Sequence, residues 1–400
     1  MANNNKHTGP NVPALRFPEF GGEWEQHSLS DYLRFKNGLN PDAKRFGKGI
    51  KFISVMDILN NASISYDCVR ASVAATEQEI SDFEVEYGDV LFQRSSETLE
   101  DIGRSNIYVD SRHCVFGGFV IRGKKIGEYE PYFMKYRLDS PYARKSIIVK
   151  GAGAQHFNIG QDGLSKVELF FPKYEEQVKI GDLLRIIDDR INTQSNIIEE
   201  LTALRSALLE KVFQVSNPTL EVGAIAHQTS ERNKLCRYSN VLSVSNRFGF
   251  INQSEQFEDR NVASDDVRNY KVVHRGDFAY NPARINVGSI AMLKSFESGI
   301  VSPMYICFQV DDTIVDPSFF ELFLETKAFK DEMEIRLEGS VRRCLSFEAL
   351  CEIHMPRPAL LVQRSITDKI GNISSKIKLE DRILRAYIRQ KEWLLKQMFI

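Results

Sequence analysis

The stretch IGDLLRIIDDRINTQSNIIEELTALRSALLEKV, residues 180–212, decides the fold of this 400-residue chain. Steps of four and three residues along it reach an apolar side chain almost every time, which is the 3.5-residue repeat of a coiled-coil seam. The seam residues are Leu184, Ile187, Ile191, Ile198 and Leu201. The stripe stays narrow over nearly five heptads, longer than an average globular helix, and so predicts a long helix that pairs with another helix.

A second stretch with the same pattern closes the chain. Residues 366–398 read ITDKIGNISSKIKLEDRILRAYIRQKEWLLKQM. The seam residues here are Ile370, Ile373, Ile377, Leu384 and Leu394. Polar residues interrupt both seams at equivalent steps, where Gln194 matches Glu380 and Arg205 matches Lys391. Two matched seams favour an antiparallel coiled coil with one block of chain at each end. The alternative is two amphipathic helices that each pack only on their own globular domain.

The two helical stretches belong to an internal duplication of the whole chain. A shift of 186 residues places Pro172 on Pro358, Gln177 on Gln363 and Gly153 on Gly339. With small changes of offset, Gly88-Asp89-Val90 also matches Gly276-Asp277-Phe278. Such self-similarity is the signature of a repeated structural unit. Each unit is a long block followed by a helix.

The blocks that precede the helices have the pattern of α+β domains. Short runs rich in β-branched and aromatic residues alternate with Gly, Asn, Asp and Ser, as expected of strands and turns. The predicted strands of the first block cover residues 51–55, 89–92, 105–109 and 115–121. A short helix is predicted at 131–138, with its echo at 317–324. We predict a first domain over 1–172, a helical spacer over 173–215, a second domain over 216–355 and a second spacer over 356–400.

Composition excludes several classes of protein. No stretch approaches the roughly 18 consecutive apolar residues of a membrane helix, and the polar N-terminus lacks the apolar run of a secretion signal. The six cysteines are scattered, without the paired spacing of a structural zinc site. We therefore expect a cytoplasmic protein with reduced thiols and no bound metal.

The formal net charge of −2 conceals an uneven distribution. Residues 216–355 carry −5 and residues 356–400 carry +6. Residues 122–150 hold eight basic and three acidic side chains, interleaved with five aromatic ones. This combination suits phosphate contacts, although a solvated helix face has the same composition.

The signatures of catalysis are absent from the sequence. No phosphate-binding glycine loop and no metal-ligand spacing of histidines is present. Asn281-Pro282-Ala283-Arg284 is similar to the Asn-Pro-Pro-aromatic motif of adenine methyltransferases but lacks the second proline and the aromatic residue. The sequence signal for an enzyme or a bound cofactor is therefore weak.

A loop at residues 151–160 carries the more specific binding pattern. Gln155, His156 and Asn158 follow a Gly-Ala-Gly turn, and the duplication places Arg342 and Arg343 in the equivalent loop. Gln and Asn can pair with adenine through two hydrogen bonds, and Arg can do so with guanine. Two related loops with different side chains suit a reader of two different half-sites. The simpler alternative is a polar surface turn in each domain.

The opening Val12-Pro13-Ala14-Leu15-Arg16-Phe17-Pro18-Glu19-Phe20, with Trp24-Glu25, closely resembles the start of type I restriction–modification specificity subunits. The Gly-Asp strands, the glycine loops and the helices entered through Phe171-Pro172 are similar to that family across essentially the whole chain. The resemblance implies two target-recognition domains that each read one half of a bipartite, asymmetric DNA site. It also implies that the helices act as a ruler between the half-sites.

The resemblance further implies partners that carry out the chemistry. Two modification subunits would dock on the helices and carry S-adenosylmethionine for adenine methylation. A restriction subunit, where bound, would supply ATP- and Mg²⁺-dependent translocation and cleavage. The specificity subunit itself would catalyse nothing.

The candidate DNA-contacting residues are polar or basic side chains near the two loops. In the first domain they are Arg94, Arg104, Lys150, Gln155, His156 and Asn158. In the second domain they are Asn281, Arg284, Arg342 and Arg343. A coiled-coil adaptor that binds only proteins is the alternative function, and it would show no salt-sensitive, sequence-selective DNA binding.

Overall fold

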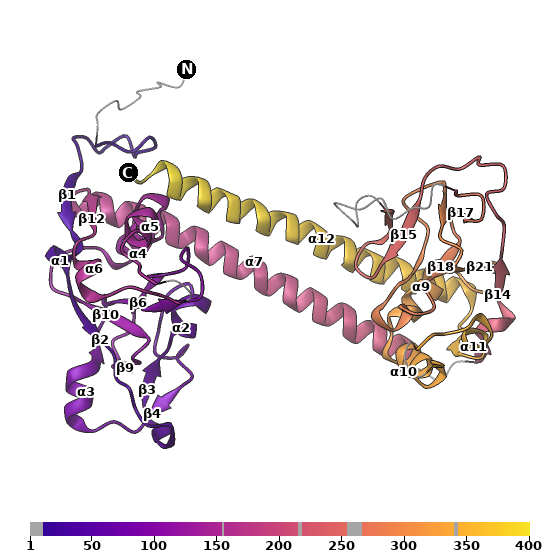
Figure 1. Cartoon of the computed structure of the whole chain (residues 1–400), viewed down its shortest axis with the longest axis horizontal. Helices are drawn as coiled ribbons and strands as arrows, with labels where there is room; N and C mark the ends of the chain where they lie inside the picture. Colours follow the sequence, from indigo (N-terminus) through magenta and orange to yellow (C-terminus); the bar gives the residue numbers. More distant parts are fainter. Residues whose placement is uncertain (1–10, 154–155, 215–217, 254–265, 340–342) are drawn as a thin grey trace. The chain divides into compact units, whose positions relative to one another are not determined.

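The computed structural model describes residues 11–153, 156–214, 218–253, 266–339 and 343–400. The chain forms two compact units, unit 1 (residues 1–196 with 381–400) and unit 2 (residues 197–380). Each unit combines one α+β block with part of two long helices (Figure 1). This confirms the predicted α+β architecture with a pair of long helices. In the described part of the chain, no helix is both long enough and apolar enough to cross a membrane.

Unit 1 is built on a four-stranded antiparallel sheet in the order β2-β10-β6-β8. Its strands are β2 (Leu33–Asn37), β10 (Val120–Lys125), β6 (Val90–Gln93) and β8 (Ser105–Ile107). A second sheet has the order β4-β3-β9-β5. Its strands are β4 (Ser72–Val73), β3 (Phe46–Ile53), β9 (Cys114–Phe116) and β5 (Glu84–Val85). All four residues of β6 are buried, as expected of a strand covered on both faces.

Short helices and two strand pairs complete unit 1. β1 (Glu25–Ser28) pairs with β12 (Glu168–Phe171), and β7 (Ser95–Ser96) pairs with β11 (Phe157–Asn158). The helices are α1 (Leu29–Tyr32), α2 (Val55–Asn60), α3 (Glu77–Phe83), α4 (Pro131–Asp139), α5 (Pro141–Ile148) and α6 (Gln161–Ser165), with a 3₁₀ turn η1 (Ala43–Arg45). α4 and α5 each begin with a proline in the first turn, behind a cap residue, Glu130 or Ser140, whose side chain accepts a main-chain N–H.

Unit 2 repeats the central sheet of unit 1 with the order β14-β21-β18-β19. Its strands are β14 (Ala226–Thr229), β21 (Ile306–Val310), β18 (Phe278–Tyr280) and β19 (Ile290–Met292). Three two-stranded pairs accompany it: β13 (Thr219–Glu221) with β22 (His354–Pro356), β15 (Leu242–Ser245) with β16 (Gly249–Asn252), and β17 (Lys271–His274) with β20 (Ser298–Val301). The helices are α9 (Pro317–Glu325), α10 (Lys327–Arg336) and α11 (Phe347–Cys351), with 3₁₀ turns η2 (Val222–Ala224) and η3 (Ile285–Val287).

Equivalent hydrogen bonds show that the duplication extends to single contacts. The buried amide of Gln177 accepts from the N–H of Glu130 (3.1 Å) and donates to the carbonyl of Pro172 (3.0 Å). The amide of Gln363, 186 residues later, accepts from Asp316 (2.9 Å) and donates to Pro358 (2.8 Å). In both units this amide joins the start of the long helix to the cap of the helix that packs beside it.

Two predicted strands are wrong in their extent. The strand predicted at 51–55 ends at Ile53, the last residue of β3, and Val55 begins α2. Residues 115–121 were expected to form a single strand, but the structure divides them into β9 and β10 with a turn at 117–119. Gly38 permits the division, because a Cβ there would lie only 2.1 Å from the carbonyl oxygen of Gly117, and the two main chains approach closely at this point. The N–H of Gly117 then donates to Ile53 of β3 (3.0 Å).

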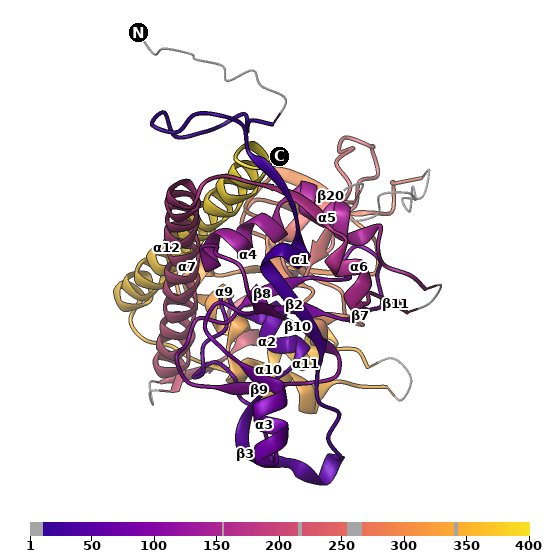
Figure 2. The same cartoon turned by 90° about the vertical axis from the view of Figure 1, so that its left-hand side faces the viewer.

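The two long helices, α7 (Tyr174–Gln214) and α12 (Leu360–Gln397), run antiparallel within each unit (Figures 1 and 2). α7 has 41 residues and is therefore about 60 Å long. In unit 1, Asp188 of α7 binds Lys391 of α12, with 2.6 Å between the carboxylate and the ammonium. In unit 2, Arg205 of α7 donates to Ser374 of α12 (2.7 Å). The duplication relates these two contacts, since 186 residues separate Asp188 from Ser374 and Arg205 from Lys391.

The helix ends enter the cores of the α+β blocks. Phe399 packs edge-on against Trp24 (6.2 Å between centroids) and beside Phe133 (5.7 Å) in unit 1. Phe213, its equivalent in the duplication, stacks on Phe319 (4.8 Å) in unit 2. The helices thus both pair with each other and pack on the blocks. Of the predicted seam residues, Leu184, Ile187, Ile370 and Leu394 are buried, whereas Ile191, Ile198, Leu201, Ile373, Ile377 and Leu384 are half-buried.

We expect Asp188→Asn to destabilise unit 1 by about 2–3 kcal/mol, because removing one partner of a buried ion pair leaves the other charge uncompensated. Asp188 also accepts from the hydroxyl of Tyr136 (2.8 Å) and lies 4.0 Å from the ammonium of Lys135. Urea unfolding followed by the fluorescence of the buried Trp24 measures the change. Asp189→Asn, at the exposed neighbouring position, is the matched control and should change the free energy of unfolding by less than about 0.5 kcal/mol. Equal effects of the two substitutions would contradict the role given to Asp188.

Candidate nucleic-acid interface

The loop at residues 151–160 of unit 1 is a tight, closed turn. Ala152 and Asn158 exchange both main-chain hydrogen bonds, at 2.9 and 2.8 Å. Gly153 has φ of +142°, and a Cβ there would lie 2.1 Å from the carbonyl oxygen of His156. The turn therefore requires glycine at this position. It leaves His156 and Asn158 exposed, while Gln155 lies outside the described residues.

Arg94, which follows the central strand β6, lies next to this loop. The N–H of Ile159 donates to the carbonyl of Arg94 (3.0 Å), and Ser95 pairs with Asn158 across β7 and β11. The guanidinium of Arg94 donates to the carbonyl of Gly118 (3.3 Å). Arg94 and Asn158 line one open hollow of about 410 Å³. The fold thus brings together two candidate residues that are 64 positions apart in the chain.

Several further residues of this hollow were not predicted from the sequence, among them two amide side chains and the carboxylate of Asp162. Asn37 at the end of β2 and Gln161 at the start of α6 both line it. Neither residue belongs to a motif, so the sequence alone carries no signal for them.

The other candidates of unit 1 lie outside this hollow. Arg104 precedes β8 and forms an exposed ion pair with Asp101 (2.7 Å). Lys150 is exposed just beyond the end of α5, near α6, since its Cβ lies 3.4 Å from the position of a Cβ on Gly163. Both side chains reach solvent, so both are open to a phosphate.

Three of the eight cations in the basic stretch 122–150 are buried and do not contribute to the phosphate-binding surface that its composition suits. Arg122, Lys135 and Arg137 are 7%, 5% and 1% exposed. Lys135 binds Asp139 (2.9 Å), and although burial alone would lower its pKa, Asp139 and Asp188 raise it. The guanidinium of Arg137 donates to the main-chain oxygens of Phe170 (2.9 Å) and Ile400 (2.6 Å), and burial lowers its pKa to about 9. Lys135 and Arg137 thus join α4 to its neighbours, and none of the three buried cations is offered to a ligand.

The described ends of the equivalent loop of unit 2 are joined in the same way as those of the loop in unit 1. Glu338 and Cys344 exchange both hydrogen bonds at 2.9 and 2.8 Å, and Gly339 has φ of +106°. The N–H of Leu345 donates to Pro282 (3.1 Å), as that of Ile159 does to Arg94. Arg343 is exposed and bound to Glu334, both through the carboxylate and through the main-chain oxygen (2.9 Å). Arg342 lies outside the described residues.

Asn281 and Arg284 differ sharply in exposure. Asn281 is 9% exposed and its side-chain oxygen accepts from the N–H of Ala283 (3.1 Å), which closes a turn after β18. Arg284 is exposed, and within the described part of the chain its guanidinium has no hydrogen-bond or ion-pair partner. Of these two candidates, Arg284 alone presents its side chain to a ligand in this conformation.

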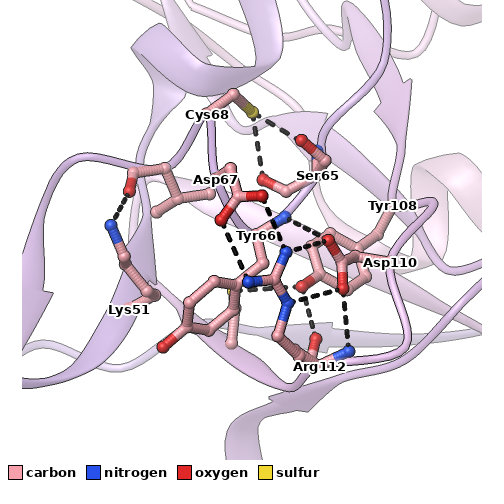
Figure 3. A network of polar contacts seen from close by, with 10 residues as sticks. Lys51, Ser65, Tyr66, Asp67, Cys68, Tyr108, Asp110 and Arg112 are labelled. Atoms are coloured by element: carbon pink, nitrogen blue, oxygen red, sulfur yellow. Dashed lines mark hydrogen bonds and ion pairs between the residues drawn. The ribbon is translucent and has the colours of Figure 1, made fainter.

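An exposed arginine elsewhere in unit 1 is fully engaged and carries no free charge. Arg112 binds both carboxylates of Asp67 and Asp110, at 2.9–3.0 Å, and its guanidinium lies 4.4 Å from the ring centre of Tyr66 (Figure 3). Hydrogen bonds from Arg112 hold the pKa of Asp67 and of Asp110 below their usual range. Two carboxylates around one arginine leave a net negative charge, so this cluster is unsuited to bind phosphate.

Part of the chain is similar in sequence to known proteins. Residues 21–203 match the family described as the type I restriction modification DNA specificity domain. The putative type I restriction enzyme MjaX specificity subunit of Methanocaldococcus jannaschii is 26% identical over 210 residues, 51% of this chain and 48% of that protein. The type I restriction enzyme EcoKI specificity subunit of Escherichia coli is 25% identical over 203 residues, 47% of this chain and 43% of that protein. The chain spans about half the length of the curated relatives it matches.

Solved structures share the fold over nearly the whole chain. The type I restriction–modification S subunit from M. genitalium superposes with a TM-score of 0.61 at 15% identity, covering 97% of this chain and 99% of that one. A chain from a structure concerned with complex assembly and conformational transition of the type I R-M system gives a TM-score of 0.53 at 12% identity, covering 93% and 96%. The resemblance predicted from the sequence is confirmed over residues 21–203, which match the type I restriction modification DNA specificity domain, and the fold of the whole chain is similar to that of solved S subunits.

Proposed function

We propose that this chain is the sequence-specific DNA-recognition subunit of a type I restriction–modification complex and reads a bipartite, asymmetric site. One observation carries the proposal. The two units present the same closed loop beside the end of the same central strand, yet with different exposed side chains: His156 and Asn158 in one, Arg343 in the other. Recognition of two unlike half-sites requires a common scaffold that carries different base-contacting side chains.

The residues of each unit have distinct roles in this proposal. Asn158 and Arg94 would contact base edges from one hollow, since an amide suits adenine and a guanidinium suits guanine. Arg284, Arg342 and Arg343 would read the second half-site, with Asn281 holding the turn that carries Arg284. Arg104, Lys150, His156 and Gln155 would flank the first. We assign the recognition domains to residues 1–172 and 216–355, and the spacers to 173–215 and 356–400.

The chemistry of the complex is assigned to other subunits. In this proposal the chain catalyses nothing and works in the cytoplasm. Two modification subunits dock on the helices, and they bind S-adenosylmethionine and methylate adenine. A restriction subunit, where present, uses ATP and Mg²⁺. The net charge of −5 over residues 216–355 fits a chain that contributes selectivity while its partners supply much of the phosphate-binding surface.

Reciprocal substitutions should degrade recognition of one half-site at a time. Arg94→Ala with Asn158→Ala should relax selectivity in one half, and Arg284→Ala with Arg342→Ala and Arg343→Ala should relax it in the other. Each lost base contact should lower discrimination about tenfold. Mapping methylated adenines in cells that carry the chain and its modification subunit measures the outcome for both half-sites at once.

Exposed arginines away from the loops provide the controls for this test. Arg70→Ala in unit 1 and Arg275→Ala in unit 2 remove a surface cation of the same type, and Arg275 is ion-paired (2.7 Å to Glu297) as Arg343 is to Glu334. Neither control should change the methylated sequence. The assignment fails if complexes that contain the loop variants still methylate only the wild-type sequence. It also fails if either set of loop substitutions changes selectivity in both half-sites equally.

Matched insertions in the two helices should lengthen the gap between the half-sites. Seven residues inserted after Gln194 and seven after Glu380 preserve the heptad pattern of both seams and add about 10 Å, close to three base pairs. Methylation mapping reads the new gap. An insertion after Gln194 alone should abolish recognition, because it mismatches the seams. An unaltered target after the double insertion would refute the ruler.

The adaptor alternative gains no support from the comparisons. It differs from the proposed function in one measurable respect. The chain bound to its modification subunit should select its site among other duplexes, with an affinity that falls steeply as salt rises. An adaptor that binds only proteins would show no selection between duplexes at any salt concentration.

A further inference from the structure

Each unit exposes one large apolar side chain on a turn next to its candidate site. Phe119 is 70% exposed and Met304 is 61% exposed. The two residues occupy the same place in the duplication. Val120, after Phe119, closes its turn onto Gly117 (2.8 Å), and Tyr305, after Met304, closes its turn onto Ser302 (3.0 Å). The strands that follow, β10 and β21, both pair with the central strand of their sheet.

The main chain of both turns is fixed, so these side chains are held at the surface. In unit 1, a Cβ on Gly118 would lie 1.8 Å from the side-chain oxygen of Asn40, and the N–H of Leu39 donates to Phe116 (2.9 Å). The segment that contains Leu39 and Asn40 therefore packs closely against the turn. In unit 2, Pro303 restricts the backbone in the same place. A phenyl ring and a thioether are therefore exposed to solvent at matching positions of the two units.

The polar candidates lie directly beside these apolar groups. The N–H of Arg94 donates to the carbonyl of Phe119 (2.9 Å), and its guanidinium donates to Gly118 (3.3 Å). In unit 2, the amide of Asn281 donates to the sulfur of Met304 (3.6 Å). Each unit thus combines a polar or charged group with an apolar one at the end of its central strand. A base pair presents the same combination in the major groove, where hydrogen-bonding edges lie beside the methyl group of thymine.

We infer that Phe119 and Met304 are specificity-determining residues that contact thymine methyl groups, Phe119 in one half-site and Met304 in the other. This inference rests on the proposed function. Apolar contacts with the thymine methyl are a recognised mode of base readout, and the contact requires a side chain that is exposed before DNA binds. The exposed apolar groups are thereby explained by a duplex DNA partner.

The test uses the full chain assembled with its modification subunit. Phe119→Ala and Met304→Ala should each weaken binding of the cognate duplex about tenfold. Methylation mapping should show relaxed selectivity in one half-site for Phe119→Ala and in the other for Met304→Ala. Phe119→Leu and Met304→Leu keep an apolar contact and should retain most of the selectivity. The slope of log affinity against log salt should stay unchanged, because no phosphate contact is removed.

Deoxyuridine in place of thymidine identifies the contacted base, since it removes the methyl group alone. Replacing the contacted thymidine should weaken binding by the wild-type chain and have no further effect on the matching alanine variant. Met56→Ala (61% exposed) and Ile335→Ala (75% exposed) are controls of similar exposure on the same units and should leave binding unchanged.

Three results would overturn the inference. These are wild-type selectivity in both alanine variants, a deoxyuridine effect that persists in them, and weakened assembly with the modification subunit at unchanged DNA selectivity. The last result would indicate that Phe119 and Met304 contact a protein partner and not DNA. Failure of the proposed function is distinguishable, because the wild-type complex itself would then show no selective binding.

Discussion

Each α+β core is completed by the end of a helix that starts in the other unit. α7 begins beside the cap of α4 in unit 1, and its end contributes Phe213 to the core of unit 2. α12 begins beside the cap of α9 in unit 2, and its end contributes Phe399 to the core of unit 1. The buried amides of Gln177 and Gln363 fix the two starts, and leaving either amide unpaired would cost about 1–3 kcal/mol. Helix length, helix direction and both cores therefore depend on one another.

Because each long helix ends in the core of the other unit, some parts of the chain must stay the same in both copies while other parts can vary. The central strands, the capped helices and the ends of α7 and α12 must match in both copies, because an aromatic ring from one copy fills a cavity in the other. The loops at 151–160 and 337–346 are closed by two main-chain hydrogen bonds each, and main-chain bonds place few demands on side chains. Under the proposed function, the loops can therefore change their readers while the scaffold stays the same.

The sequence predicts those features whose cause is local or duplicated. The seam from Leu184 to Leu201 is visible because its period follows from helix geometry, and the glycine loops are visible because they recur at an offset of 186. Features that depend on distant partners are not predictable in this way. Arg137 belongs to a basic stretch, yet it is buried because it binds Ile400, 263 positions away. The turn at Gly117 interrupts a stretch of strand-forming residues because the chain at Gly38 passes close by.

The same reasoning accounts for the incomplete prediction of the candidate site. Arg94 and Asn158 were chosen for their chemistry, and the hydrogen bond between Ile159 and Arg94 brings them together. Asn37 and Gln161 line the same hollow because the fold places them there, and no sequence pattern indicates it. Phe119 and Met304 carry no polar or charged group that a sequence pattern could mark as a binding residue, and their exposure on a turn depends on the tertiary structure around it.

The acidic character of unit 2 has a physical consequence for selectivity. Several of its exposed cations pair with carboxylates, as Arg343 does with Glu334, Lys294 with Glu321 and Arg275 with Glu297. Exposed ion pairs contribute only about 0–1 kcal/mol each, so a better partner can displace the carboxylate. A phosphate approaching Arg343 also meets the repulsion of Glu334, whereas the neutral edge of a base does not. Under the proposed function, the carboxylates would weaken binding to arbitrary DNA more than binding to the cognate bases, and the negative charge would then sharpen recognition rather than oppose it.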